Sequence, residues 1–519
     1  VLHAHLPFVR HPEHPVFLEE NWLFEAMIES YIPLVDMLGR LQADGIDIRL
    51  GLGLSPTLCE MLSDDLLRER FAARLDALID LSRKELDRTQ PHPEFHRTAV
   101  LYNRHFERAK VVFEETFGRD LLSAFRAFQE AGTLEIICCP ATHAFLPLLV
   151  NRRAIRAQLR MGIRNYRRHF GCEPRGLWLP ECAYVPGLDE ELAAENLRYF
   201  FLDSHGILFG TPRPKYGIFA PVLCRSRVAV FGRDIESSKQ VWSSQTGYPG
   251  DADYREFYRD LGYDADYDYV APYLHPDGIR HDVGIKYHRV TGAVALSDKQ
   301  PYNPERARIK VDRHATDFLA NRQKQARHLR ELLGRPPLIV APYDAELFGH
   351  WWYEGPQFLE LFLRKTACDQ KDIELVTPSG YLEQHPSLQV VEPSASSWGD
   401  KGYFEVWLNG SNDWIYRHLH KAEERMTELA DANGEPSTLR TRALNQAARE
   451  LMLAESSDWA FIMTTGTTVD YAVRRVRDHL DRFDALCVML RERRMQEERL
   501  ADWEHRDALF GDRQLAERS

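Results

Sequence analysis

Apolar positions in the first 400 residues form short runs that alternate with longer stretches of helical periodicity. Short runs of this kind suit strands that are buried on both faces, as in a parallel sheet. The predicted strands are residues 1–8, 46–54, 134–139, 176–179, 199–202, 228–231, 338–341 and 373–376. Residues 21–41 and 155–169 carry apolar positions at helical spacing between neighbouring runs. This alternation predicts an α/β fold built on a parallel sheet.

Two segments interrupt the alternation. Residues 56–130 are charged and helical throughout, a length that exceeds an ordinary crossover and predicts a helical insertion. Residues 233–290 are rich in Tyr, Gly, Pro and Asp with weak periodicity, which is typical of a long functional loop region.

Strand patterns all but disappear after residue 400. Long amphipathic helices are predicted instead, at residues 416–432, 439–454 and 469–492. We therefore expect two domains, residues 1–400 and a C-terminal α-helical domain over residues 401–519.

Composition narrows the classes of function. The 519 residues are 44% hydrophobic and 28% charged, as in a folded globular chain, and carry a net charge of −12. This charge argues against a nucleic-acid partner, which usually needs a basic face, and no apolar run approaches the ~18 residues of a membrane span. The eight cysteines lack C-x-x-C or disulfide spacing, and the first residues lack the layout of a signal peptide. We expect a cytoplasmic protein with free thiols and a neutral substrate.

Two carboxylates follow buried runs in the same way. Residues 176–187, GLWLPECAYVPG, place Glu181 after an apolar run and a proline. Residues 338–353, LIVAPYDAELFGHWWY, place Asp344 after another such run. Strand-end groups converge at one mouth of a barrel, and paired carboxylates serve glycoside cleavage. The alternative is that each acid only caps the helix that follows it.

Histidines add a second set of strand-end groups. His3, His5 and His143 all lie in or just after predicted strands. Together with Asp344 they suit a zinc site, and they equally suit a polar floor that hydrogen-bonds sugar hydroxyls. The residues alone leave both interpretations open.

Aromatic residues gather in and beside the same motifs. Flat indole and phenol rings stack on the apolar faces of sugar rings, although some of these rings will only fill the core. The candidates for substrate binding are Trp22, Trp242, Tyr248, Trp398, Trp407, Trp414 and Trp459.

The combined motifs resemble glycoside hydrolase family 57, in particular its α-1,4-glucan branching-enzyme subgroup. The matching stretches are HAHLPFV at 3–9, PATHAFLPLL at 140–149, GLWLPECAY at 176–184 and APYDAELFGHWW at 341–352, followed by QVWSSQTGYPGD, GIKYHRVTG, SSWGDKGYFEVWLNGSNDWIYRHLH and ESSDWAF. The resemblance covers nearly the whole chain. It implies a (β/α)7 barrel with a helical insertion and a C-terminal α-helical domain, no metal, no cofactor, and a retaining double displacement.

The resemblance also implies roles for particular residues. Glu181 would be the nucleophile and Asp344 the general acid/base, with His5 and His143 lining the donor sugar site. Further residues would place the C-terminal domain against the glucan: Trp407, Trp414, Asp458 and Trp459. We expect the loop over residues 233–260, with Trp242 and Tyr248, to shield the covalent intermediate from water.

Several functions use such a site. The leading prediction is a branching enzyme that acts on amylose or a glycogen-like α-glucan as a monomer. An α-amylase-like hydrolase or a 4-α-glucanotransferase would use the same carboxylates. A metal-dependent polysaccharide deacetylase would use the histidines instead, and a glycan-binding protein without catalysis would need neither.

Overall fold

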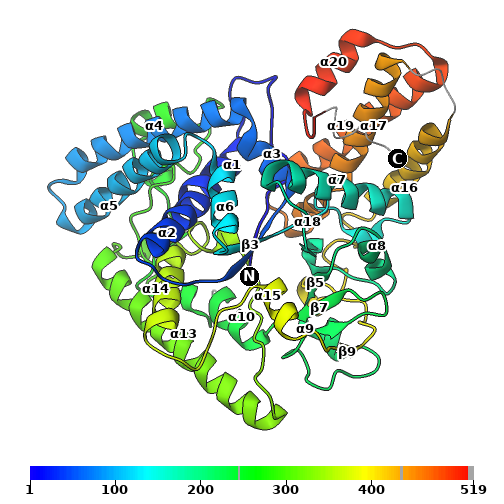
Figure 1. The fold of residues 1–519 in the computed structure, drawn as a ribbon. Helices are drawn as coiled ribbons and strands as arrows, with labels where there is room; N and C mark the ends of the chain where they lie inside the picture. The colour runs from blue at the N-terminus through cyan, green and yellow to red at the C-terminus, as the bar shows by residue number, and fades with distance from the viewer. Residues whose placement is uncertain (244–245, 433–436, 512–519) are drawn as a thin grey trace.

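The computed structural model describes residues 1–243, 246–432 and 437–511 (Figure 1). At its centre lie seven short parallel strands, all within the first 344 residues and connected by segments that contain helices. Their bounds are β1 Leu2–Ala4, β2 Leu50–Leu54, β3 Leu134–Ile137, β4 Gly176–Leu177, β5 Tyr199–Leu202, β7 Ala229–Gly232 and β8 Tyr343–Asp344. Two further pairs of residues, β6 Val222–Leu223 and β9 Gln389–Val390, extend one side of the sheet, with β6 antiparallel to β7.

The seven strands close into a ring. Continuous ladders join β3, β2, β1 and β8 on one side and β4, β5 and β7 on the other. Two parallel bridges link these groups: Cys138 with Leu177, and Arg233 with Val340. In the ladder between β1 and β8, His3 lies opposite Asp344. The predicted (β/α)7 barrel is therefore confirmed, because every strand of the ring runs parallel to its neighbours.

Aromatic side chains fill the interior of the ring. Trp178, Tyr199 and Phe201 are at most 1% exposed, and Phe201 stacks on Phe231 with ring centroids 5.5 Å apart. Burial of each such side chain stabilises the fold by about 1.5–3 kcal/mol. Gly176 makes room for this packing, since a Cβ atom there would lie 2.1 Å from the Tyr199 ring.

Helices cover the outside of the ring. The first crossover consists of α1 Glu20–Ala26, the π-helical turn η1 Met27–Tyr31 and α2 Ile32–Ala43. The segment between β2 and β3 is helical: α3 Pro56–Ser63, α4 Asp65–Thr89, α5 Pro93–Lys110, η2 Val111–Thr116 and α6 Leu121–Glu130. Helices α7 Arg152–Phe170, α8 Leu188–Ala194 and α9 Ser204–Leu208 follow β3, β4 and β5.

The region after β7 combines short helical turns with irregular backbone. It contains α10 Ile235–Trp242, η5 Tyr248–Gly250, α11 Leu261–Asp264, α12 Tyr267–Val270, η6 Ala271–Tyr273 and η7 Leu296–Asp298. This agrees with the weak periodicity of residues 233–290, of which 244–245 lie outside the described part. The long helix α13 Pro304–Leu333 then leads toward β8, and α14 Gly355–Cys368 packs against it.

Two predicted strands differ from the structure. Residues 338–341 make only a single bridge, and the ladder forms at Tyr343–Asp344 instead. Prolines 336, 337 and 342 flank the apolar run and lack the N–H groups that a continuous ladder needs. Residues 373–376 form no strand, because the Gln370 side chain hydrogen-bonds both backbone polar groups of Ile373. The helix α15 Pro378–Gln384 follows directly.

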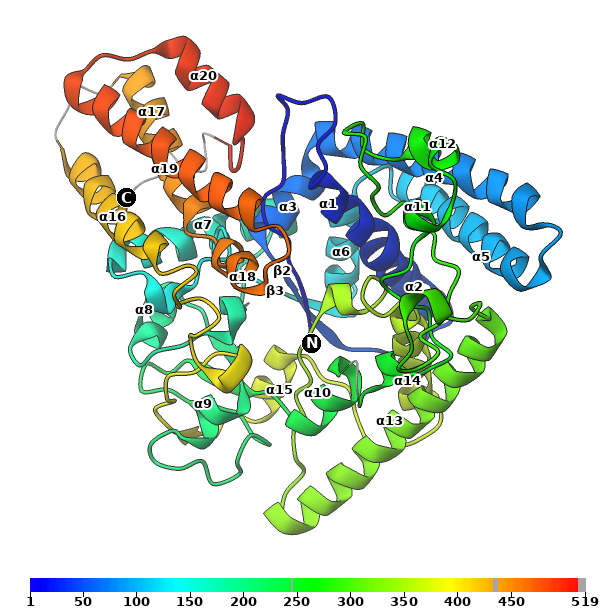
Figure 2. The ribbon, with the colours of Figure 1, turned by 180° about the vertical axis from the view of Figure 1, so that it is seen from behind.

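The C-terminal part is helical, and most of it forms a lobe beside the barrel (Figures 1 and 2). Its helices are α16 Trp414–Asp431, α17 Thr438–Ala454, α18 Ser457–Thr465, α19 Val469–Glu492 and α20 Glu497–Arg506. Helices α17 and α19 pack along each other, whereas the short α18 begins directly after Ser456, which forms a bridge with Ala144 in the segment after β3. Residues 433–436 and 512–519 of the predicted domain lie outside the described residues. Within the described part, no helix is long and apolar enough to cross a membrane.

Candidate active site

A polar or ionisable residue follows every strand of the ring at its carboxyl end. This is the end at which barrel enzymes place their functional groups. In chain order these residues are His5, Ser55, His143, Glu181, Asp203, Arg233 and Asp344. Two residues of α18, Ser457 and Asp458, reach the same group of side chains from the C-terminal part.

Glu181 lies in a tight turn at the end of β4. Its φ of 62° is in the left-handed region, and Cys182 follows with a φ of 49°. Such a conformation is unfavourable for residues with a Cβ and is concentrated at functional sites. Hydrogen bonds hold the turn: the Trp398 backbone N–H donates to the Glu181 carbonyl at 2.9 Å, and Cys182 N–H donates to Leu179.

Two donors from distant segments hold the Glu181 carboxylate. Trp398 Nε1 donates to Oε2 at 2.9 Å, and the Ser457 hydroxyl donates to Oε1 at 3.0 Å. The pKa of Glu181 is raised to about 6, chiefly by burial and also by the charge of Asp458, while the two hydrogen bonds and the charge of His5 oppose the shift. Glu181 is consequently ionised above about pH 6, as a nucleophile must be.

Asp344 ends β8 on the opposite side of the barrel mouth. Burial raises the pKa of Asp344 to about 8, and the negative charges of Glu346 and Glu181 contribute. The positive charges of Arg233 and His5 oppose this shift. Asp344 therefore keeps its proton at neutral pH while Glu181 has lost its own. A general acid must carry a proton and a nucleophile must be ionised, so these protonation states suit the two roles.

His5 forms an ion pair with the C-terminal part. Its Nε2 lies 3.0 Å from both oxygens of Asp458, and its Nδ1 lies 2.8 Å from the Ser55 hydroxyl. Burial lowers the pKa of His5, but the negative charges of Asp458, Glu181 and Glu346 and the hydrogen bond to Asp458 together raise it by more, so the net shift is upward. The backbone N–H of His5 also donates to Glu346 at 3.1 Å. His5 is thus tied to three elements.

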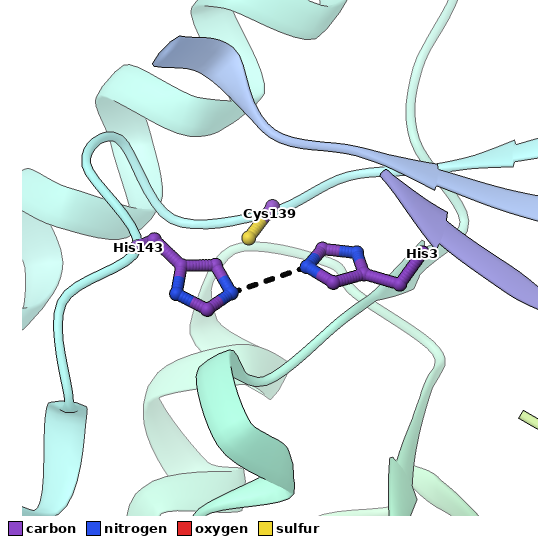
Figure 3. A group of neighbouring side chains, drawn as sticks. All are labelled: His3, Cys139 and His143. Atoms are coloured by element: carbon purple, nitrogen blue, oxygen red, sulfur yellow. Dashed lines mark hydrogen bonds between the residues drawn. The ribbon is translucent and has the colours of Figure 1, made fainter. Parts of the chain in front are cut away.

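His143 stacks on His5 with ring centroids 3.7 Å apart. Its Nδ1 lies 2.9 Å from the Ser457 hydroxyl, and its Nε2 lies 3.1 Å from His3 Nε2. Figure 3 shows the contact between the two histidines beside Cys139. Burial and the neighbouring His5 charge hold the pKa of His143 well below its usual range, so this ring is neutral.

Metal binding would compete with this network. His3, Cys139 and His143 form one group with metal-ligand spacing, and His5, His143 and Asp458 form another. Both ring nitrogens of His5 and of His143 already have hydrogen-bonding partners in the protein. The arrangement therefore favours a hydrogen-bonded floor over the metal site that the sequence left open.

Four contributors to the site were not predicted from the sequence: Ser55, Asp203, Arg233 and Ser457. Ser457 contacts both Glu181 and His143, and the Arg233 guanidinium lies 5.5 Å from the Trp398 ring centroid. Arg233 Nη1 also lies 3.3 Å from Asp203 Oδ2. The position of Arg233 directly after an apolar run was a usable signal. Ser457 adjoins Asp458 in the ESSDWAF motif, but a serine there carries no recognisable pattern.

The tryptophan candidates separate by burial. Trp398 lies at the site through its hydrogen bond to Glu181 and is half-buried. Trp407 and Trp459 are each 1% exposed, whereas a ring that stacks on a sugar needs an exposed face. Trp407 packs on Phe145, and Trp459 Nε1 donates to the Leu453 carbonyl at 2.7 Å. A fully covered indole has no open face for a sugar, so these two rings support the walls of the site.

The remaining aromatic candidates are not brought to the carboxylates by any contact among the described residues. Trp22 packs edge-on against Tyr471, at the junction between the first helix and α19. Trp414 lies under the Arg477 guanidinium. Trp242 is 48% exposed at the end of α10. The Tyr248 hydroxyl donates to Asp317 of α13 at 2.7 Å. Their part in substrate binding stays a prediction.

Comparison with known families covers nearly the whole chain. A family model described as glycosyl hydrolase family 57 matches residues 1–393. A second model, described as 1,4-alpha-glucan branching enzyme, C-terminal, matches residues 418–515.

Individual relatives are similar in sequence and in structure. A 1,4-alpha-glucan branching enzyme of Thermococcus kodakarensis is 34% identical over 516 residues, which cover 94% of this chain and 72% of the relative. The solved structure of the alpha-amylase AmyC from Thermotoga maritima is 46% identical with a TM-score of 0.92, covering 100% of this chain and 98% of that one. A GH57-type branching enzyme from Pyrococcus horikoshii is 34% identical with a TM-score of 0.90, covering 100% and 96%.

Proposed function

Because the chain belongs to glycosyl hydrolase family 57, we propose that it is a retaining 1,4-α-glucan branching enzyme. In this proposal it cleaves an α-1,4 bond of a linear glucan and transfers the released chain to a 6-hydroxyl. Glu181 is the nucleophile and Asp344 the general acid/base.

The first step breaks the α-1,4 bond. The Glu181 carboxylate attacks the anomeric carbon while Asp344 gives its proton to the glycosidic oxygen, so the reducing-end fragment leaves with a new hydroxyl. The pKa values of about 6 and about 8 support these roles, since one carboxyl is ionised and the other protonated near pH 7. The positive charge on His5 balances the carboxylates that face it.

The second step decides the product. The ionised Asp344 takes the proton from an acceptor 6-hydroxyl, the acceptor oxygen displaces Glu181 from the anomeric carbon, and an α-1,6 bond forms with net retention. If water takes the place of the acceptor, the same step completes a hydrolysis. Exclusion of water from the intermediate therefore favours branching.

One observation carries the branching proposal. The segment that matches the branching-enzyme C-terminal model contains Ser457 and Asp458, and these residues contact Glu181 and His5 directly. The part of the chain that is similar to branching enzymes is thus in contact with the proposed nucleophile.

Product analysis tests the proposal. Amylose is incubated with the enzyme, digested with a debranching enzyme that cuts only α-1,6 bonds, and the chains are resolved by length. We expect new short chains after debranching, with few new reducing ends before it. Glu181→Gln should produce neither, because an amide cannot attack the anomeric carbon. New reducing ends without debranchable chains would refute branching.

The second candidate is an α-amylase-like hydrolase. The 46% identical structure from Thermotoga maritima is described as an alpha-amylase, and hydrolysis uses the same two carboxylates. The assay above distinguishes the two candidates by the ratio of reducing ends to branches. Activity that survives exhaustive chelation and is lost in Glu181→Gln would exclude the metal-dependent deacetylase.

Two further properties belong to the proposal. The enzyme acts as a monomer, which size-exclusion chromatography with light scattering would test. It works in the cytoplasm, in keeping with the eight free cysteines of the chain, six of which are buried.

A further inference from the structure

A compact loop outside the barrel mouth brings together three groups that the proposed reaction does not use. The loop is HPDGIRH, from His275 to His281, in the irregular region after β7. His275, Asp277 and His281 each offer one ligand atom, and these atoms lie within 4.8 Å of one another. We propose that this loop is a binding site for a divalent transition-metal ion such as Zn²⁺.

The ligand atoms converge on one side of the loop. Asp277 Oδ2 lies 2.8 Å from His281 Nε2 and 3.2 Å from His275 Nδ1. Ligand atoms of a tetrahedral zinc ion with bonds of about 2.0–2.2 Å lie about 3.3–3.6 Å apart. The 3.2 Å spacing is near this range, whereas the 2.8 Å contact is a hydrogen bond that would have to lengthen when an ion binds.

Hydrogen bonding leaves one of the ligand atoms unsatisfied. His275 Nδ1 is shielded from solvent and makes no hydrogen bond with any described residue, although Asp277 Oδ2 is near. A buried ring nitrogen without a partner costs free energy, and a coordinated metal ion would remove that cost. The other carboxylate oxygen accepts the Ile279 N–H at 2.9 Å, so the turn itself orients Oδ2 toward the histidines.

The backbone around the three ligands is fixed in place. Arg280 donates to the Gly262 and Ala265 carbonyls at 2.6 and 2.9 Å. The His281 carbonyl packs so closely on Gly262 that a Cβ there would lie 2.0 Å away. A site on a rigid backbone loses little entropy when the ion binds.

The donor set selects the class of ion. Two imidazoles and one carboxylate suit Zn²⁺, Co²⁺, Ni²⁺ or Fe²⁺, whereas Ca²⁺ and Mg²⁺ prefer oxygen ligands only. Three protein ligands leave at least one position for water.

Metal titration of the full chain tests the site. Protein freed of metal with a chelator is titrated with Zn²⁺ by calorimetry and with Co²⁺ by visible absorption. We expect uptake at a site that His275→Ala, His281→Ala and Asp277→Asn each weaken by at least about tenfold. His328→Ala, which removes an exposed histidine of α13, is the matched control and should bind as the wild type does.

A second measurement separates lost binding from lost folding. Zn²⁺ should raise the melting temperature of the wild type and of His328→Ala, and leave that of the three loop variants unchanged. Asp277→Asn keeps the size of the side chain, so it serves if an alanine variant does not fold. The proposal is overturned if the wild type takes up no Zn²⁺, or if the loop variants bind it as tightly as the wild type.

Discussion

At the scale of single residues, Ser457 bridges the carboxylate of Glu181 and the neutral ring of His143. Its hydroxyl donates to Glu181 at 3.0 Å and lies 2.9 Å from the neutral His143. Because the hydroxyl has a single proton, donation to Glu181 leaves its lone pairs free to accept from His143 Nδ1–H. Ser457 thus fixes both the orientation of the nucleophile and the tautomer of His143.

Replacement of Ser457 by alanine should weaken the nucleophile without unfolding the chain. The hydroxyl lowers the pKa of Glu181, so its loss raises that pKa and shifts the acid limb of the kcat/KM profile to higher pH. A hydrogen bond to a charged group is worth about 1.5–3 kcal/mol, which corresponds to a loss of about 10- to 100-fold in kcat. The pH profile on a soluble maltooligosaccharide measures both effects. Ser297→Ala, at an exposed serine, should leave the profile unchanged.

The two carboxyls predict a bell-shaped pH profile. Activity should fall below about pH 6 as Glu181 becomes protonated, and above about pH 8 as Asp344 loses its proton. With an α-glucosyl fluoride, whose leaving group needs no acid, Asp344→Asn should still form the glycosyl–enzyme, and the alkaline limb should vanish. If that limb persists in the variant, another group sets it.

Asp344 should also make the folded chain less stable as the pH rises. Its carboxyl stays protonated in the folded chain up to about pH 8, but in the unfolded chain it ionises near the ordinary pKa of 3.8. Between these values the unfolded state binds fewer protons, so stability falls with rising pH. At pH 8.5 the free energy of unfolding of Asp344→Asn should therefore exceed that of the wild type by on the order of 2 kcal/mol, with a higher melting temperature, and the difference should be smaller at pH 4.5. An equal difference at both pH values would contradict this account.

Some of the site could be predicted from residue patterns and some could not. Glu181 and Asp344 follow apolar runs that end near prolines, so their place at strand ends was visible in the sequence. The contact between Ser457 and Glu181 joins residues 276 positions apart, and no local periodicity encodes it. The burial of Trp407 and Trp459 was equally hidden, because an indole in a polar segment resembles an exposed one until the packing is known.

At the scale of elements, helix α7 sits unusually close to the strand-end loop that carries His143. A Cβ atom on Gly162 of α7 would lie 2.1 Å from the Cys139 carbonyl oxygen. Gly39 of α2 is also inside a helix, but a Cβ atom there would meet nothing within 4 Å. A side chain therefore fits at Gly39, whereas at Gly162 it would clash with the backbone of Cys139.

Alanine at each of these glycines should have opposite effects. Gly39→Ala should stabilise the chain by about 0.5–1 kcal/mol, because alanine reduces the backbone entropy lost in a helix. Gly162→Ala should destabilise it by about 1–3 kcal/mol, since α7 must move away from the backbone at Cys139. Melting temperatures of both variants measure the difference. A stabilised Gly162→Ala would mean that α7 can shift without cost.

The boundaries of some elements followed from the pattern of apolar residues in the sequence. Helix α19 spans Val469–Glu492 and strand β5 spans Tyr199–Leu202, as the patterns predicted. The strand expected at residues 338–341 formed at Tyr343–Asp344 instead, because its partner is β1 and the ladder depends on which N–H groups are available there. Short α18 escaped prediction since it shows little amphipathic pattern and is packed on several sides.

At the scale of the whole molecule, segments near the two ends of the chain are in direct contact. Arg10 donates to the carbonyls of His505 and Arg506 and to Asp64. Arg475 of α19 donates a hydrogen bond to the Phe8 carbonyl at 3.4 Å. The barrel and the C-terminal helices are thus joined by buried polar contacts as well as by the active site.

Removal of the Arg10 side chain should loosen the C-terminal helix selectively. In Arg10→Ala, amide hydrogen exchange in α20 should accelerate by about 10-fold, which is the effect of losing on the order of 1.4 kcal/mol of local stability. Strands β1 to β3 should exchange as in the wild type. Arg97→Ala, at an exposed arginine of α5, is the control. Uniform acceleration across the barrel would show that the contact stabilises the whole fold instead.

The closure of the ring through β8 sets an order of events during synthesis. β1 takes part in the ladder to β8, yet 338 residues separate Ala4 from Tyr343, counted as 343 − 4 − 1. At about 5–20 residues per second, a ribosome needs roughly 20–70 s to make that intervening stretch. For this time one edge of β1 has no partner strand, and an open edge can pair with other chains. The nascent protein should therefore depend on chaperones that cover this edge, and a circular permutant that starts at α13 would shorten the wait.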